Sequence, residues 1–310
     1  MHVVSIQTAD WYDILFNGDE NSQAAFQFIK DCGFAAVDHN LDHTLSVKQI
    51  EARERPALFE KTRAEILEEH RHLKEAAEKT GVAIGQAHAP FPTYVEGDPE
   101  YNAYLVHVFE ELLHVCAYIG CPALVIHPVK IEDKRLQWDL NIELYTKLIP
   151  TAKETGVKIC LENLNDRRGD HAIQGVCGNG EEACRYIDTL NELAGEEIFG
   201  FCLDVGHANM ASQNIRQMIN ILGHRITVLH IHDNDGVYDR HLIPYTYKDA
   251  ARTSTSLDWE GLLEGLKDIG YQGALNFETF AALKAMPQEL FEPTLRYVAA
   301  IGRYFQNRLA

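Results

Sequence analysis

The sequence predicts an α/β protein whose 310 residues form one (β/α)8 TIM barrel, a single domain over residues 1–310. Short apolar segments alternate strictly with amphipathic helical segments, which is typical of a parallel sheet with right-handed crossovers. Eight such units fit the length of the chain, as they do in closed barrels. No Gly/Ser-rich or Pro-rich linker interrupts them. An open doubly wound sheet is the main alternative, and the lack of a GxGxxG motif after the first strand weakens its dinucleotide-binding version.

In the first half, glycines separate each predicted helix from the strand that follows it. Strands are predicted at residues 3–7, 35–37, 82–87 and 123–126, and helices at 21–32, 58–79 and 99–119. Gly33, Gly81 and Gly120 stand where a residue with a left-handed backbone commonly ends a helix. The regular recurrence of this pattern supports the prediction of successive strand–helix units.

The second half continues in the same way. Strands are predicted at 157–161, 199–203, 228–230 and 274–277, and helices at 139–154, 181–193, 215–222, 258–266 and 287–305. Three long segments after strands, at 41–56, 165–179 and 236–257, are predicted to be irregular. They belong to the face on which barrel enzymes carry their sites. The glycine-rich and charged segment at 165–180 is predicted to be a mobile lid.

Composition excludes several classes of function. The formal net charge is −18, with 46 acidic against 28 basic residues, so general binding to nucleic acid is disfavoured and a small neutral substrate is favoured. The seven cysteines include no CxxC pair, and several lie within apolar runs, as expected of buried thiols in a reduced, cytoplasmic protein. The sequence shows neither a signal peptide nor an apolar run long enough to span a membrane. It permits a homo-oligomer.

Acidic or imidazole side chains follow each of the last six predicted strands. In a barrel, the carboxyl ends of the strands converge on one mouth, so we expect these side chains to lie close together. They are His88, His127, Glu162, Asp204 with His207, His230 with His232, and Glu278.

Two of these residues are hard to explain without a function. Glu162 and Glu278 directly follow buried strands, where a lone carboxylate costs several kcal/mol unless it is paired or metal-bound. By contrast, His88 and His127 could simply bind backbone carbonyls, and Asp204 could cap a turn. Two or three carboxylates with one imidazole make a hard, oxygen-rich donor set.

The sequence therefore predicts a site for one divalent cation. Mn²⁺ is the expected ion, with Mg²⁺, Co²⁺ or Zn²⁺ as alternatives. The predicted ligands are Glu162, Asp204, His230 and Glu278.

Over its whole length the chain resembles the xylose isomerase-like TIM barrels, the sugar phosphate isomerase/epimerase superfamily. Four short motifs at successive strand ends carry the resemblance: Leu161-Glu162-Asn163, Leu203-Asp204-Val205-Gly206-His207, His230-Ile231-His232-Asp233-Asn234-Asp235 and Phe277-Glu278-Thr279. In the ketose 3-epimerase and isomerase branches, the resemblance implies that the four predicted ligands hold a metal that polarises a sugar carbonyl. An enediolate then forms when a neighbouring carbon loses its proton.

The resemblance also implies roles for individual residues. Glu162 and Glu278 would lie on either side of the substrate, one removing the proton and the other returning it, so both are predicted to be catalytic. His207 resembles a contact to a substrate oxygen and is the third predicted catalytic residue. Arg240 is the nearest match to an arginine that the epimerases carry after the seventh strand. The predicted substrate-binding residues are His88, His127, His207, His232 and Arg240.

Three other functions stay open at this stage. Endonuclease IV-type enzymes bind three zinc ions with nine ligands, and this chain has a candidate for each, with Asp239 and His241 as possible extra metal ligands. Other relatives cleave 3-oxo-glycosides, including C-glycosides, by metal-assisted enolisation followed by elimination. In that reaction His127 or His207 could act as the base. The third is a barrel without catalytic activity that keeps a metal for structure alone.

Overall fold

Eight parallel strands form the centre of the computed structural model, which describes residues 2–9, 11–16, 21–247 and 257–310. They lie in the order β10-β1-β2-β3-β4-β5-β8-β9. Their bounds are β1 Val4–Gln7, β2 Ala36–Asn40, β3 Ala83–His88, β4 Ala123–Val125, β5 Lys158–Glu162, β8 Phe199–Asp204, β9 Ile226–His230 and β10 Leu275–Phe277. A parallel bridge between Ile231 and Phe277 joins β9 to β10. The predicted (β/α)8 barrel is therefore confirmed.

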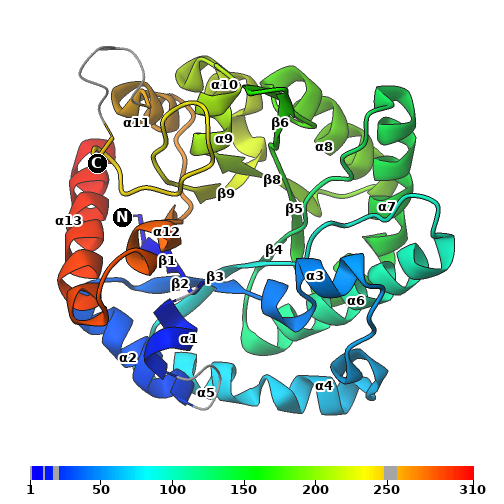
Figure 1. Ribbon diagram of the computed structural model, residues 1–310, viewed down its shortest axis with the longest axis horizontal. Helices are drawn as coiled ribbons and strands as arrows, with labels where there is room; N and C mark the ends of the chain where they lie inside the picture. Colours follow the sequence, from blue (N-terminus) through cyan, green and yellow to red (C-terminus); the bar gives the residue numbers. More distant parts are fainter. Residues whose placement is uncertain (1, 10, 17–20, 248–256) are drawn as a thin grey trace.

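Helices surround the strands as a ring (Figure 1). The longer ones are α2 Ser22–Cys32, α5 Arg71–Thr80, α6 Pro99–Ile119, α7 Lys134–Thr155, α8 Gly180–Ala194, α10 Ile215–Leu222, α11 Trp259–Asp268 and α13 Phe291–Leu309. The shorter ones are α1 Trp11–Phe16, α3 Val47–Glu51, α4 Arg63–Glu69, α9 Val205–Met210 and α12 Phe280–Lys284. Within the described ranges, no helix is both long and apolar enough to cross a membrane.

The alternation of side chains along each strand places the polar residues at the barrel mouth. Along β5, Ile159 and Leu161 join the large core between strands and helices, whereas Cys160 belongs to a small second cluster. Because neighbouring side chains point to opposite faces, Glu162 shares the inner face with Cys160. Val125, Cys202 and Val228 are in the same inner cluster, and each stands two positions before a polar residue that was predicted for the site. Those residues are His127, Asp204 and His230.

The cysteines are free thiols, as predicted. All seven are unpaired, and six of them are buried, with Cys184 half-buried. Burial raises the pKa of the Cys160 thiol to about 12, so the thiol at the barrel axis is neutral and packs as a small apolar group.

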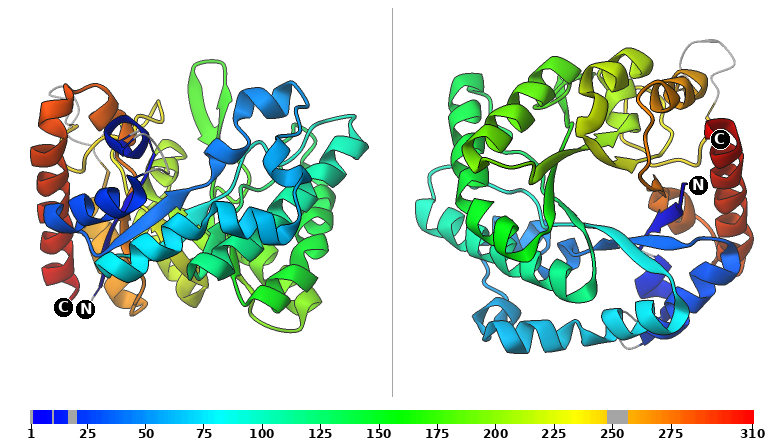
Figure 2. Two further views of the ribbon diagram at one scale, coloured as in Figure 1. Left: turned by 90° about the horizontal axis from the view of Figure 1, so that it is seen from below. Right: turned by 180° about the vertical axis from the view of Figure 1, so that it is seen from behind.

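The prediction of an irregular segment at 165–179 is wrong. Strand β6 Asn165–Arg168 pairs antiparallel with β7 His171–Gln174. Gly169 has a φ of 59°, and the two-residue connection between the strands needs such a left-handed residue, which glycine adopts at little cost. In the left view of Figure 2 this hairpin stands out from the end of the barrel opposite the two termini.

The long helix predicted at 58–79 is interrupted. Helix α4 begins after Thr62, which forms a capping box with Glu65, and it ends before His70. The buried His70 ring contacts the Ile66 carbonyl oxygen through Nδ1 at 2.8 Å, and α5 begins at the next residue. The irregular segment predicted at 41–56 contains the short helix α3. Of the segment predicted at 236–257, residues 248–256 lie outside the described residues.

An ion pair joins α4 to α6, and we expect it to stabilise the barrel in a pH-dependent way. Arg63 Nη2 donates to Glu111 Oε1 at 2.8 Å, and the Glu111 side chain is only 6% exposed. Burial opposes ionisation of this carboxyl, but the hydrogen bond from Arg63 outweighs it and holds the pKa of Glu111 below its ordinary value. A lowered folded-state pKa contributes stability above the unfolded pKa, and that stability is lost as the pH falls.

Replacing Arg63 by Gln should therefore lower the free energy of unfolding at pH 7 by about 1–2 kcal/mol. The deficit relative to the unmodified protein should shrink toward pH 4, and urea titrations at the two pH values measure it. Lys147→Gln, which breaks the exposed i,i+4 pair with Glu143, serves as control and should cost less than about 0.5 kcal/mol. An equal deficit for Arg63→Gln at both pH values would contradict the assigned role of the ion pair.

Candidate active site

Three carboxylates from the ends of three strands surround one imidazole nitrogen. Nδ1 of His230 lies 3.4 Å from Glu162 Oε2, 3.4 Å from Glu278 Oε2 and 4.0 Å from Asp204 Oδ2. All four side chains are buried. Among the described residues, neither Nδ1 of His230 nor Oε2 of Glu162 has a hydrogen-bond partner. Buried atoms of this kind carry a desolvation cost unless something binds them, so the group has the arrangement expected of ligands to a cation.

The donor chemistry fits a divalent metal ion. The four predicted ligands belong to overlapping groups able to hold an ion, in which the ligand atoms lie within 4.8 Å of one another: Asp204, His230 and Glu278 form one group, and Glu162 joins Asp204 and His207 in another. Three carboxylates and one imidazole favour Mn²⁺, Mg²⁺ or Zn²⁺ over a soft ion. The structure thus brings together the four predicted ligands, Glu162, Asp204, His230 and Glu278.

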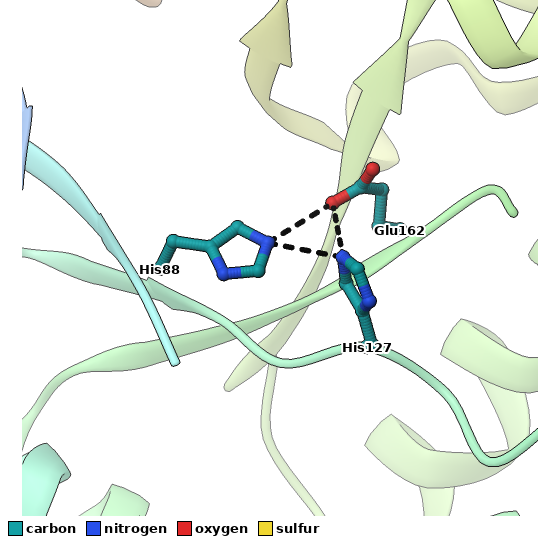
Figure 3. A group of neighbouring side chains, drawn as sticks. All are labelled: His88, His127 and Glu162. Carbon is teal, nitrogen blue, oxygen red and sulfur yellow. Dashed lines mark hydrogen bonds and ion pairs between the residues drawn. The ribbon is translucent and has the colours of Figure 1, made fainter. Parts of the chain in front are cut away.

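A second group meets at the same glutamate (Figure 3). Nε2 of His127 lies 3.2 Å from Glu162 Oε2, and Nε2 of His88 lies 3.6 Å from the same oxygen. The two imidazole nitrogens are 3.0 Å apart. The His230 group and this histidine pair therefore share one oxygen of Glu162, and the rings of His88 and His230 stack with their centres 5.7 Å apart.

A third group forms around Asp239, in the segment that follows β9 in the chain. Its Oδ2 lies 3.0 Å from His207 Nε2, and its Oδ1 lies 3.2 Å from His241 Nε2. His232 stacks on His241 with the ring centres 4.1 Å apart. Every acidic and imidazole residue that the sequence predicted for the site thus belongs to one of three adjoining groups.

Neighbouring imidazoles counteract the effect of burial on the pKa of Glu162. Burial disfavours the charged form of Glu162, but the imidazoles of His230 and His127 outweigh it and hold its pKa well below the ordinary value. Burial likewise opposes the charge on His207, yet Asp204 and Asp239 hold its pKa well above the ordinary value. The site is a dense network of paired charges in which protons are shared among neighbours.

The motif around Asp204 is built by a tight turn at the end of β8. Asp204 caps α9, since its Oδ1 accepts from the backbone N–H of His207 at 2.6 Å. Asn163 bridges to the backbone of Asp204 in both directions, at 2.8 Å each. These bonds fix the Asp204 carboxylate at the barrel mouth, where Nε2 of His232 also contacts it at 3.1 Å.

Gly206 is needed because the His232 ring packs directly on its backbone. A methyl group at this position would lie 2.0 Å from Cε1 of His232. We expect Gly206→Ala to displace the ring, to lower the free energy of unfolding by about 1–3 kcal/mol in urea titrations, and to weaken metal binding. Gly85→Ala serves as control, because its nearest added contact is 3.6 Å away. Wild-type stability and metal affinity in Gly206→Ala would rule out this packing constraint.

A cavity of about 600 Å³ opens onto the site, within the size range of pockets for small molecules. Its inner end is lined by His88, His127, Glu162, His207, Asp239, His241 and Glu278. Two half-buried rings flank them: Phe91 packs on His127 with ring centres 4.8 Å apart, and Phe280 packs on His241 at 4.4 Å.

Two predicted substrate-binding residues are not among those that line this cavity. Arg240 is exposed, and its guanidinium is held by Asp235 and lies over the Tyr238 ring. His232 is fully buried beneath the surface of the cavity, in contact with Asp204. Both placements follow from strong local partners that the sequence pattern did not reveal.

The sequence-based prediction missed two polar residues of the site. Asp38, in the middle of β2, lies 3.3 Å from Nε2 of His230. Gln7 ends β1 and donates to Glu278 Oε1 at 2.5 Å. Gln7 is the last residue of β1, and Asp38 directly follows the strand predicted at 35–37, so the strand-end rule that identified the other residues could have found them.

The fold and the site define a TIM barrel with a group of metal-binding type at the carboxyl ends of its strands. Residues 26–300 match the model of the xylose isomerase-like TIM barrel, and the chain belongs to this family. The resemblance seen in the four motifs is thereby confirmed.

Relatives from several bacteria align over much of the chain. An uncharacterized protein of Sinorhizobium fredii is 23% identical over 314 residues, covering 96% of this chain and 87% of its own. The D-psicose 3-epimerase of Ruminiclostridium cellulolyticum is 24% identical over 222 residues, or 68% of each chain. The structure of 3-keto-D-glucoside 4-epimerase from E. coli superposes with a TM-score of 0.71 at 18% identity, covering 98% of this chain and all of that one. The last two of these relatives are named as sugar epimerases, and the inosose isomerase of Bacillus subtilis is 24% identical over 187 residues, or 59% of this chain and 63% of its own.

Proposed function

We propose that the protein is a divalent-metal-dependent isomerase or epimerase of a sugar or sugar derivative. The observation that carries the proposal is the position of Glu162 and Glu278. These two buried glutamates come from β5 and from the residue after β10, lie at equal distance from His230, and both line the cavity. Carboxylates placed in this way can exchange protons with a substrate from two sides. The sugar epimerases among the relatives support the choice of substrate class.

Four residues would hold the cation, and the two glutamates among them would also move protons. Bound by Glu162, Asp204, His230 and Glu278, a divalent ion such as Mn²⁺ would polarise the substrate carbonyl and lower the cost of charge on its oxygen. One glutamate accepts the proton of the carbon next to the carbonyl, which leaves an enediolate, and the other glutamate returns a proton to the opposite face. Proton return to a different carbon gives isomerisation, and return to the same carbon gives epimerisation.

His207 is placed to assist these transfers. Its Nδ1 lies 3.2 Å from Glu162 Oε1, and its Nε2 contacts Asp239 at 3.0 Å. Burial lowers the pKa of His207, but Asp204 and Asp239 outweigh it and hold that pKa well above its ordinary value, which favours the charged ring. A substrate oxygen that takes the place of Asp239 at Nε2 would receive a hydrogen bond from this ring.

The charges of the cavity favour an unphosphorylated substrate. Among the described residues that line the cavity, the lysine and arginine side chains are Lys130 and Lys284. Lys130 is engaged by Asp166 at 3.3 Å and by the Asn165 carbonyl at 3.0 Å. The aromatic rings of Phe91 and Phe280 suit the apolar face of a sugar or of a group attached to it.

A second function, a multi-metal phosphodiesterase, is favoured by one observation. His88 and His127 with Glu162, and His232 with Asp239 and His241, form two further groups able to hold ions. Three metals in one cluster would suit hydrolysis of a phosphate ester. The net charge of −18 argues against a nucleic-acid substrate, so this function ranks second.

Metal analysis and a substrate panel separate the candidates. We expect about one tightly bound divalent ion per chain and, with Mn²⁺, interconversion of ketoses or of 3-oxo-glycosides followed by chromatography. Release of an aglycone from a 3-oxo-glycoside would identify elimination instead. Two or three tightly bound zinc ions together with cleavage of abasic DNA would replace the isomerase proposal by the second function.

A further inference from the structure

The second ring nitrogen of His230 faces a carboxylate below the site. Asp38 is fully buried on the inner face of β2, and its Oδ2 lies 3.3 Å from Nε2 of His230. The same oxygen accepts from Gln86 Nε2 at 3.0 Å and from Asn276 Nδ2 at 2.9 Å. Two amide donors from β3 and β10 thus fix the carboxylate from either side.

The two nitrogens of the ring face different carboxylates, and neither has a hydrogen-bond partner among the described residues. Nδ1 faces Glu162, Asp204 and Glu278, and Nε2 faces Asp38. A neutral imidazole binds a metal through the nitrogen that carries no proton, so the proton must sit on the other one. An ionised carboxylate can only accept hydrogen bonds, and therefore favours a proton on the nitrogen that faces it.

We propose that Asp38 is the positioning residue of the metal site, which holds His230 with its proton on Nε2 and its Nδ1 lone pair directed at the three carboxylates. The inference deepens the proposed function, and it rests only on the part that places a cation at His230. It requires no particular sugar and no particular reaction.

The network around Asp38 is poorly suited to a purely structural role. Among the described residues, Asp38 Oδ1, Gln86 Oε1 and Asn276 Oδ1 have no hydrogen-bond partner although all three are buried. A buried polar network with unsatisfied acceptors stabilises a core less than apolar side chains of similar volume would. The unsatisfied acceptors are understandable if the network serves the ring of His230 and not the stability of the barrel.

The substitution Asp38→Asn tests this role without changing the size of the side chain. An asparagine amide can donate to Nε2, which would leave the ring proton on Nδ1, where the cation must bind. We expect the affinity for Mn²⁺, measured by competition with a chelator, to fall by about 10- to 100-fold. Gln86→Met is the matched control: it removes one donor to the same carboxylate but leaves the carboxylate beside Nε2, so its Mn²⁺ affinity should stay close to that of the wild type.

Equal Mn²⁺ affinity in Asp38→Asn and the wild type would overturn the proposal. So would an equal loss in Asp38→Asn and Gln86→Met, because that result would indicate a merely structural network. Nitrogen-15 spectra of the wild-type protein loaded with diamagnetic Zn²⁺ provide a readout that needs no substitution. We expect a protonated Nε2 on His230, and ligation of the ion through Nε2 would overturn the assignment.

These measurements use the metal alone, so they separate the inference from the reaction. A protein that binds Mn²⁺ in an Asp38-dependent manner but converts no sugar would remove the proposed function and keep the inference. An active isomerase whose metal affinity is unchanged by Asp38→Asn would keep the proposed function and remove the inference.

Discussion

Replacing Glu278 by Gln should lower the turnover of the Mn²⁺-loaded protein by about 10²- to 10⁴-fold, the usual contribution of a positioned general acid or base. The substitution keeps the shape of the side chain but removes its ability to take a proton. Because Gln7 holds Oε1 of Glu278, the neutral side chain should keep its place beside His230. Glu162→Gln should lose at least as much activity, since Glu162 contacts His127, His207 and His230 at once.

Glu182 provides the matched control for these substitutions. It is a half-buried glutamate in the first turn of α8, and it is not among the residues that line the cavity. Glu182→Gln should leave turnover unchanged. Turnover of Glu278→Gln within a factor of about three of the wild type, with its metal retained, would remove Glu278 from proton transfer.

Removal of the divalent ion should abolish turnover and also destabilise the fold. The three carboxylates around His230 repel one another once no cation is bound between them. An ion that binds only the folded state adds about 4 kcal/mol to the free energy of unfolding at a free concentration of 1,000 times its Kd. We therefore expect Mn²⁺ to raise the melting temperature of chelator-treated protein by several degrees, as measured by calorimetry.

Two histidine substitutions show whether this stabilisation arises at the proposed site. His230→Gln removes the central ligand and should abolish the response of the melting temperature to Mn²⁺. His171 lies exposed on β7, in the hairpin outside the barrel, and His171→Gln should respond to Mn²⁺ as the wild type does. A full response in His230→Gln would place the stabilising ion elsewhere.

The barrel and the proximity of the predicted metal ligands could be derived from the sequence because they depend on local rules. A buried strand that ends in a charged residue is visible as an apolar run followed by that residue, as at Glu162 and Glu278. Parallel strands bring their carboxyl ends together, so residues that follow successive strands in the sequence lie close together in the barrel. Because side chains two positions apart on a strand point to the same face, Glu162 points to the inside of the barrel as Cys160 does.

The rest depended on partners that are distant in sequence. Asp38 contacts Gln86, Asn276 and His230, and no spacing along the chain indicates that these four residues meet. Arg240 is an exception, because its partner is local: it was expected near the substrate, but Asp235, five residues earlier, holds it at the surface.

The errors in secondary structure had a different, local cause. The capping box at Thr62 and the left-handed Gly169 were both visible in the sequence. The longer apolar pattern at 58–79 favoured the prediction of one continuous helix despite the capping box. The density of charges at 165–179 favoured the prediction of an irregular segment despite Gly169.

The most direct test of the central claim is whether solvent deuterium enters the substrate. The Mn²⁺-loaded protein is incubated in D₂O with each sugar of the panel, and the recovered sugars are analysed by NMR and mass spectrometry. Proton abstraction by Glu162 or Glu278 predicts deuterium at the carbon next to the carbonyl of a turned-over sugar, and none after chelation. Conversion of a sugar without any deuterium at that carbon, or exchange that continues after the metal is removed, would contradict metal-dependent proton abstraction as the function of this site.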